Sequence, residues 1–355
     1  YEEGRRVSGY CFYAAFFFGL VVMLILFFGQ TPFLRLLGAD QATWKYAREY
    51  YLVIAAGAPF IIFFFAPVNI LRTEGLAMES MKASVIGTVI NIVLNPFFIF
   101  TCGLGAAGSA LATVLGNVIG DGLMLYYIHT KSQHLTLSIK ETKISRQLKK
   151  EIYAIGIPAS VTNLMATFAM AMTNRYLITY GATSVAAMGI ALKISMVINM
   201  VFAGFAFGAQ PLIGYTYGAK DAKRFRAVIK LDLLVVCGFA LVMTVVLWLL
   251  APVVVRWFMT NPVVITHGTR MVRWLVSSAT FAGLVLVFTT MFQSMGKALP
   301  AFLLSFSRQG LIFFLALTIL APTLGYTGIL ASQLLADLVT AGLAILLFLP
   351  YRLKG

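Results

Sequence analysis

The sequence predicts an all-α polytopic membrane protein, and three observations support this fold class. Hydrophobic residues make up 60% of the 355 residues and charged residues only 11%, whereas a soluble domain carries roughly 25% charged residues. Apolar runs of about 20 residues, the length of a helix that crosses a bilayer, recur along the whole chain. These runs are too continuous for membrane β-strands, which alternate apolar and polar residues over about ten positions.

Ten apolar runs are expected to span the membrane. They lie at about residues 9–29, 50–72, 79–101, 107–128, 152–179, 183–213, 227–250, 271–294, 300–321 and 326–350. Most lysine and arginine residues fall in alternate loops, above all in the segment 131–150, which places this segment and the C-terminus in the cytoplasm. The net charge of +15 therefore reflects membrane topology, and nucleic acid is not expected as a partner.

An internal repeat relates the two ends of the sequence. Shifting the chain by 221 residues, or by 220 after a one-residue slip, pairs Phe60 with Phe281, Gly75 with Gly296 and Gly108 with Gly328. The helices expected at 152–213 have no counterpart in the first half, so we expect two further helices, about 70 residues, before Tyr1. Six helices in each half make the halves parallel, related by a pseudo-two-fold axis along the membrane normal.

The repeat predicts two six-helix lobes in a protein of twelve helices. Residues 1–130 form the N-terminal lobe with helices 3–6, and residues 151–355 form the C-terminal lobe with helices 7–12. Residues 131–150 form a polar, basic, cytoplasmic linker between the lobes, expected to be helical from Ser145 onward.

One acidic residue inside a predicted span is the main functional candidate, because a charge at the bilayer centre costs about 2.5–3.5 kcal/mol on insertion scales. Asp121 shares a helix face with Asn117 at i, i+4 spacing, and Asn91 and Asn95 have the same spacing on the preceding helix. A carboxylate near amide oxygens can take up a proton or a sodium ion, so these four residues predict a cation-coupling site. The alternative is that the asparagines only hold neighbouring helices together.

A polar stripe in the span at 152–179 is the second candidate. Its residues follow one helix face at spacings of +4, +3 and +4, and they are Asn163, Thr167, Met170 and Asn174. Such a face contacts protein or water rather than lipid, so we predict that it lines a substrate cavity. We assign Asp337, in the last span, to the same cavity, with structural hydrogen bonding as an equal alternative.

No pattern typical of an enzyme or a metal site appears in the sequence. Cys11, Cys102 and Cys237 are single and scattered, and no nucleotide-binding or metal-binding spacing is present. We expect no catalytic residue, no metal and no cofactor, and the only inorganic partner expected is a coupling ion, H⁺ or Na⁺.

Four segments resemble the multidrug and toxic compound extrusion (MATE) family, and the resemblance covers essentially the whole chain. They are ILRTEGLAMESMKASVIGTVINIVLNPFFIF at 70–100, GLGAAGSALATVLGNVIGDGLMLYY at 103–127, AAMGIALKI at 186–194 and GAQPLIGYTYGAKDAKRFR at 208–226. Within the family the sequence looks most similar to the bacterial branch of MepA/DinF-like drug exporters.

The resemblance implies a cation-coupled antiporter, a monomer in the bacterial inner membrane. Its substrates would be drug-like or xenobiotic organic molecules, amphipathic and often cationic, and membrane lipids would surround it. The family pattern associates coupling with acids on helices 1 and 6 and amides on helix 5. Asp121 fits the helix 6 acid, and Asn91 and Asn95 fit the helix 5 amides approximately. Ala166 stands near the position where another branch has an acid on helix 7.

Two further hypotheses remain. One is a lipid-linked oligosaccharide flippase of the same superfamily, which would need a strongly basic cavity for diphosphate. Lys193 is the only cation counted in the middle of a predicted span, which argues against this function. The other is a non-transporting membrane scaffold or a membrane enzyme, which would be expected to carry a catalytic constellation or an appended soluble domain.

Overall fold

The computed structural model describes residues 2–36, 44–138 and 141–351. Among these residues, ten helices are long and apolar enough to cross a membrane, which confirms the predicted all-α membrane fold. The chain divides into two compact units, Tyr1–Lys149 (unit 1) and Lys150–Gly355 (unit 2).

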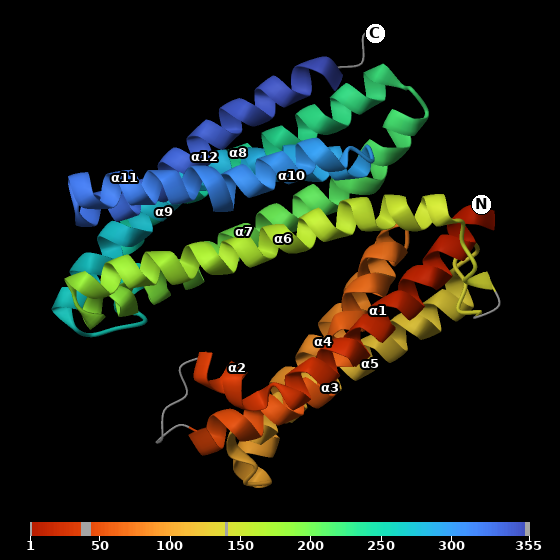
Figure 1. The fold of residues 1–355 in the computed structure, drawn as a ribbon, viewed down its shortest axis with the longest axis horizontal. Helices are drawn as coiled ribbons and strands as arrows, with labels where there is room; N and C mark the ends of the chain where they lie inside the picture. The colour runs from red at the N-terminus through yellow and green to blue at the C-terminus, as the bar shows by residue number, and fades with distance from the viewer. Residues whose placement is uncertain (1, 37–43, 139–140, 352–355) are drawn as a thin grey trace. The chain divides into compact units, whose positions relative to one another are not determined.

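Unit 1 is a bundle of helices that run alongside one another (Figure 1). Its elements are α1 (Glu2–Phe28), the short α2 (Gln30–Leu36), α3 (Trp44–Thr73), α4 (Ala77–Pro96), the π-helical turn η1 (Phe97–Thr101) and α5 (Gly105–Lys131). Phe12, Phe63 and Met124 meet in its apolar core, which joins α1, α3 and α5. Burial of such side chains and close helix contact hold these elements together.

Unit 2 contains the remaining elements, except that the first four residues of α6 belong to unit 1. They are α6 (Arg146–Leu177), η3 (Ile178–Tyr180), α7 (Ala182–Gly218), α8 (Ala222–Arg256), α9 (Pro262–Ser294), α10 (Ala298–Phe306), η4 (Ser307–Leu311), α11 (Ile312–Leu324), α12 (Tyr326–Phe348) and η5 (Leu349–Tyr351). Among the described spans α9 is the most buried, and its side chains pack against α7, α8 and α12. The segment from α10 through the π-helical turn η4 to α11 crosses as one span, Ala298–Leu324.

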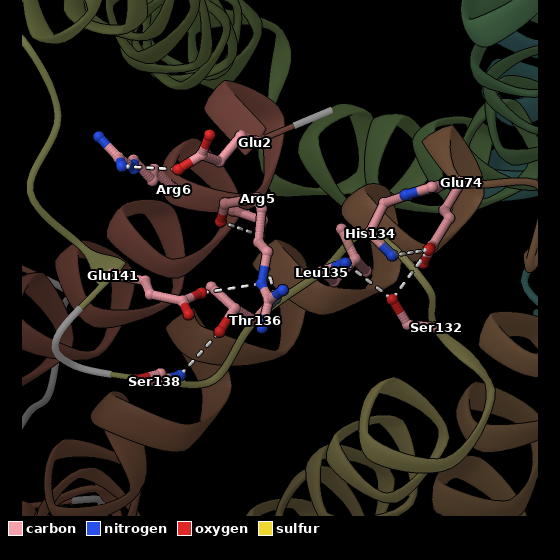
Figure 2. A network of polar contacts seen from close by, with 11 residues as sticks. Glu2, Arg5, Arg6, Glu74, Ser132, His134, Leu135, Thr136, Ser138 and Glu141 are labelled. Atoms are coloured by element: carbon pink, nitrogen blue, oxygen red, sulfur yellow. Dashed lines mark hydrogen bonds and ion pairs between the residues drawn. The ribbon is translucent and has the colours of Figure 1, made fainter.

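Within unit 1, the segment that follows α5 folds back onto α1 and the end of α3 (Figure 2). One carboxylate oxygen of Glu74, the residue that follows α3, accepts three hydrogen bonds. The donors are the hydroxyl of Ser132 (2.8 Å) and the backbone N–H groups of Gln133 (2.9 Å) and His134 (2.8 Å). Further along the segment, Arg5 forms an ion pair with Glu141 at 2.8 Å. These contacts anchor the first part of the predicted linker on the helices that precede it.

The linker becomes helical where the sequence predicts. The backbone N–H of Leu148 donates to the hydroxyl oxygen of Ser145 at 3.2 Å, and α6 begins at the next residue, Arg146. A serine hydroxyl in this position accepts one of the N–H groups that the first turn of a helix leaves unpaired.

Candidate functional site

Unit 2 encloses a cavity of about 260 Å³ between α6, α7, α9, η4, α11 and α12. Apolar side chains such as Met170, Phe202 and Phe313 form part of its wall. Amide side chains also line it, from Asn174, Asn199, Gln309 and Gln333. A mostly apolar pocket with a few convergent polar groups is the usual form of a small-molecule site.

An ion pair lies in the wall of this cavity. The guanidinium Nε of Arg308 donates to Oδ1 of Asp337 at 2.6 Å, and Nε2 of Gln333 donates to the same oxygen at 3.0 Å. The side chain of Asp337 is 1% exposed and that of Arg308 is 19% exposed. Because the aspartate is buried, the arginine and the glutamine offset much of the cost of removing its charge from water.

Arg308 corrects one expectation from the sequence. The sequence patterns point to Lys193 as the only cation in the middle of a span, but Arg308 lies inside the predicted span 300–321 and is the cation in the cavity wall. Lys193 is exposed on α7 and does not line the cavity. The sequence does contain a signal for Arg308. Inserting an arginine into the middle of a membrane span costs about as much free energy as inserting an aspartate, so both need a structural or functional reason.

Arg308 also occupies unusual backbone. It lies in η4, a π-helical turn in which backbone hydrogen bonds join residues five apart instead of four. Each turn therefore holds more residues than a turn of an α-helix. Such π-helical turns are frequent at functional sites. The turn redirects the residues that follow it relative to a regular helix, so periodicity alone does not predict which face holds Arg308.

The predicted polar stripe on α6 divides between two environments. Met170 and Asn174 line the cavity, as does Asp337 from α12. Asn163 and Thr167 are exposed and lie outside the cavity wall, and each donates a hydrogen bond to the backbone of its own helix, at 3.1 Å in both cases. The structure therefore gathers three of the five predicted cavity residues at one site in unit 2.

A second polar cluster lies in unit 1, between α4 and α5. Nδ2 of Asn91 donates to the hydroxyl of Thr113 at 3.1 Å, and Nδ2 of Asn117 donates to the backbone carbonyl of Thr113 at 2.9 Å. Asn95 is half-buried one turn beyond Asn91. The two asparagines from different helices thus meet at Thr113, a residue that the sequence patterns did not single out.

Asp121 lies one turn beyond Asn117 on α5 and is buried, with 4% of its surface exposed. Neither of its carboxylate oxygens has a hydrogen-bond partner among the described residues. A buried, unpaired carboxylate is costly in a protein interior, and few buried side-chain groups lack a partner. A proton or a bound cation would remove most of that cost.

Glycines allow α4 and α5 to approach closely at this cluster. A Cβ atom on Gly87 would lie 2.6 Å from the carbonyl oxygen of Gly116, and a Cβ atom on Gly116 would lie 2.7 Å from the carbonyl oxygen of Gly87. Small residues at such crossings let helix backbones come into contact within membranes. This contact brings Asn91 within reach of Thr113.

Comparison with known proteins assigns the chain to a family. A family model described as MatE matches residues 1–97 and 158–318, which is more than half of the chain. The chain belongs to the MATE family. It is therefore an integral membrane protein of a transporter family and not an enzyme, as the sequence patterns predict.

Individual relatives of this MATE protein agree with the assignment. The chain is 28% identical over 356 residues to the multidrug export protein MepA of Staphylococcus haemolyticus, a match that covers 100% of this chain and 78% of the relative. The solved structure of a MOP-superfamily transporter from Pyrococcus furiosus matches with a TM-score of 0.91, 25% identity and coverage of 98% of this chain and 78% of the other. A multidrug-resistance MATE transporter in an outward-facing conformation matches with a TM-score of 0.89, 26% identity and coverage of 97% and 77%.

Proposed function

We propose that this MATE protein is an antiporter, coupled to H⁺ or Na⁺, that exports drug-like or xenobiotic organic molecules across a bacterial cytoplasmic membrane. Its relatives include proteins named as multidrug exporters. A cavity of about 260 Å³ with apolar walls and several amide groups suits small organic substrates of varied structure. In this proposal residues 1–130 and 151–355 are the two lobes, and 131–150 is the cytoplasmic linker.

The buried carboxylate of Asp121 carries the proposal of ion coupling. Its two oxygens have no hydrogen-bond partner among the described residues, although Asn117 and Asn91 lie on the same cluster of helices. A proton or Na⁺ that binds there neutralises the charge. An ion shifts the equilibrium between inward-open and outward-open states only by its different affinity for the two. A carboxylate that is buried in one state and hydrated in the other supplies such a difference.

Substrate binding is assigned to unit 2. Met170, Asn174 and Asp337 line its cavity, and the exposed Asn163 and Thr167 extend the same helix face beyond it. Flexible, polarizable methionine side chains suit a surface that accepts many ligands.

The flippase alternative would need a strongly basic cavity. The charged residues in the cavity wall are Arg308 and Asp337, which pair with each other. The charges in this wall sum to zero, and one guanidinium is too few to hold a diphosphate with its several negative charges.

Transport in proteoliposomes tests the proposal, with proton and sodium gradients imposed separately. Asp121→Asn keeps the shape of the side chain but can neither bind a proton nor carry the charge that attracts Na⁺. We expect it to fold and to bind substrate, and to lose gradient-driven export by about 100-fold or more, on the order of the loss of an essential proton-transfer group.

The matched control is Asp232→Asn. Asp232 is also a buried aspartate within a membrane span, on α8 in unit 2, with 6% of its surface exposed. Export by this variant should stay close to that of the unmodified protein. If Asp121→Asn exports normally under an imposed gradient, Asp121 is a structural residue and the proposed coupling site is wrong.

A further inference from the structure

The charge that a molecule would meet in the unit 2 cavity is positive. Arg308 and Asp337 are the charged residues in the cavity wall, and they form one ion pair. The aspartate is 1% exposed, whereas the arginine side chain is 19% exposed. Asp337 therefore lies behind Arg308, and the guanidinium is the charged group that faces the space.

The ion pair leaves the end of the guanidinium group free. Arginine has five N–H donors in a planar fork, and the bond to Asp337 uses only Nε. Among the described residues, no hydrogen bond joins the terminal nitrogens Nη1 and Nη2 to another group, and neither nitrogen is buried away from solvent. These two nitrogens form the side of the fork that binds a carboxylate through two parallel hydrogen bonds.

The remainder of the wall matches the other parts of an amphipathic molecule. Phe202 and Phe313 offer apolar surface, and the amides of Asn174 and Gln309 offer neutral hydrogen-bonding groups. A cation would meet the guanidinium first and could reach Asp337 only by displacing it. A carboxylate could bind without breaking any contact that the structure shows.

We propose that this cavity selects amphipathic organic monocarboxylates, whose carboxylate binds the terminal nitrogens of Arg308 while the apolar body packs against the cavity wall. The proposal rests on the assignment of this cavity as the substrate site. It also changes the charge expected of the substrate, because the family resemblance pointed to substrates that are often cationic.

Three matched probes test the proposal on the purified protein without an ion gradient. They are 1-naphthaleneacetic acid, its primary amide, and (1-naphthylmethyl)trimethylammonium, which share the apolar ring and differ in charge. Equilibrium dialysis at pH 7 gives the three dissociation constants. We expect the acid to bind about 10-fold or more tightly than the amide, because hydrogen bonds to charged groups are roughly twice as strong as neutral ones. The ammonium compound should bind most weakly.

Variants then locate the preference. Removing Arg308 alone would leave Asp337 as a buried, unpaired charge and could prevent folding. The double variant Arg308→Gln/Asp337→Asn removes both charges together and should bind acid and amide equally. Arg308→Lys keeps the charge but loses the planar fork, so its preference for the acid should be reduced. Lys193→Gln, which removes an exposed cation outside the cavity, is the control and should keep the full preference.

Four results would overturn the proposal. They are equal binding of acid and amide, tighter binding of the ammonium compound, no binding of any probe, and a preference that persists in the double variant. Failure of ion coupling is distinguishable, because Asp121→Asn should keep the preference for the acid whether or not it exports.

Discussion

The contact between α4 and α5 in unit 1 makes a definite prediction for Gly87→Ala. The added methyl group would lie 2.6 Å from the carbonyl oxygen of Gly116, where ordinary contacts of a Cβ atom are 3.4 Å or longer. The oxygen that the methyl group meets belongs to a helix backbone, so no side chain can rotate to make room. The helices must separate by several tenths of an ångström, which would lengthen the 3.1 Å bond from Asn91 to Thr113.

The expected cost follows from two opposing effects. Forcing an extra methyl group into a packed interior costs about 1–3 kcal/mol. Replacing glycine by alanine within a helix returns about 0.5–1 kcal/mol, because alanine loses less backbone entropy on folding. Gly87→Ala should therefore lower the free energy of unfolding by up to about 2.5 kcal/mol, with a central value of about 1 kcal/mol.

Gly122→Ala is the matched control. Gly122 lies on α5, and a Cβ atom there would have no atom of the described residues within 4 Å. This variant gains helix propensity without a clash, so its stability should stay the same or rise. The assay is the midpoint of unfolding in mixed micelles of dodecylmaltoside and increasing SDS. If both variants unfold at the same midpoint, α4 and α5 do not pack backbone to backbone at Gly87.

Two further predictions concern helix ends in the two units. Glu74→Ala removes the acceptor of the N–H groups of Gln133 and His134, so hydrogen exchange of these amides should accelerate about 10-fold or more. Glu74→Gln keeps an acceptor oxygen and should retain most of the protection, and equal protection in both variants would exclude this anchor. Asp221→Ala removes the carboxylate that accepts the N–H of Arg224 at 3.0 Å at the start of α8. It should cost about 0.5–2 kcal/mol in the same unfolding assay, and Asp221→Asn should cost little, whereas equal losses would contradict a capping role.

The spans were predictable because apolar length is a property of composition, but their ends were not. The run expected at 152–179 corresponds to α6, which begins earlier, at Arg146. The run expected at 183–213 corresponds to α7, which continues to Gly218. Hydropathy detects only the part of a helix that lies in lipid, whereas α6 starts at a serine cap in a basic, polar stretch. Helix ends outside the bilayer depend on capping and turn residues instead.

The site residues were predictable one at a time, but their partners were not. Asp121 and Asp337 were found because a charge inside a span needs a physical reason. Thr113 escaped notice because threonine is common in membrane helices, and its contact with Asn91 depends on how closely two glycines let the helices approach. The pairing of Arg308 with Asp337 joins residues on different helices, one of them in a π-helical turn, and no single-helix periodicity contains that information.

The internal repeat relates the two polar clusters. In the register read from the glycines, a shift of 220 residues places Thr113 on Gln333 and Asn117 on Asp337. In unit 1 Thr113 makes the contact with the preceding helix, through Asn91, and Asn117 bonds within α5. In unit 2 Asp337 makes the contact with the preceding helical segment, through Arg308, and Gln333 bonds within α12. The same two positions of the helix therefore carry a polar cluster in each unit, but the bond to the preceding helix is made at the first position in unit 1 and at the second in unit 2.

The charges around these shared positions differ between the units, and this difference supports the division of roles that we propose. The repeat places Gly87 on Arg308, so the position where unit 1 brings two helix backbones into contact is the position where unit 2 holds a cation beside a cavity. It also places Asp121 on Ala341, so unit 2 has no acid where unit 1 has an unpaired, buried one. A closely packed cluster with an unneutralised carboxylate suits a ligand as small as a proton or Na⁺. In the unit 2 cavity Arg308 already neutralises Asp337, so no proton or cation is required there. The free guanidinium nitrogens of Arg308 suit a larger organic ligand. Transferring the acid should test this argument. Ala341→Asp in the Asp121→Asn background should not restore gradient-driven export, because Ala341 packs in an apolar core of unit 2 and an acid there would not belong to the polar cluster of α4 and α5. Restored export would show that the two positions are interchangeable.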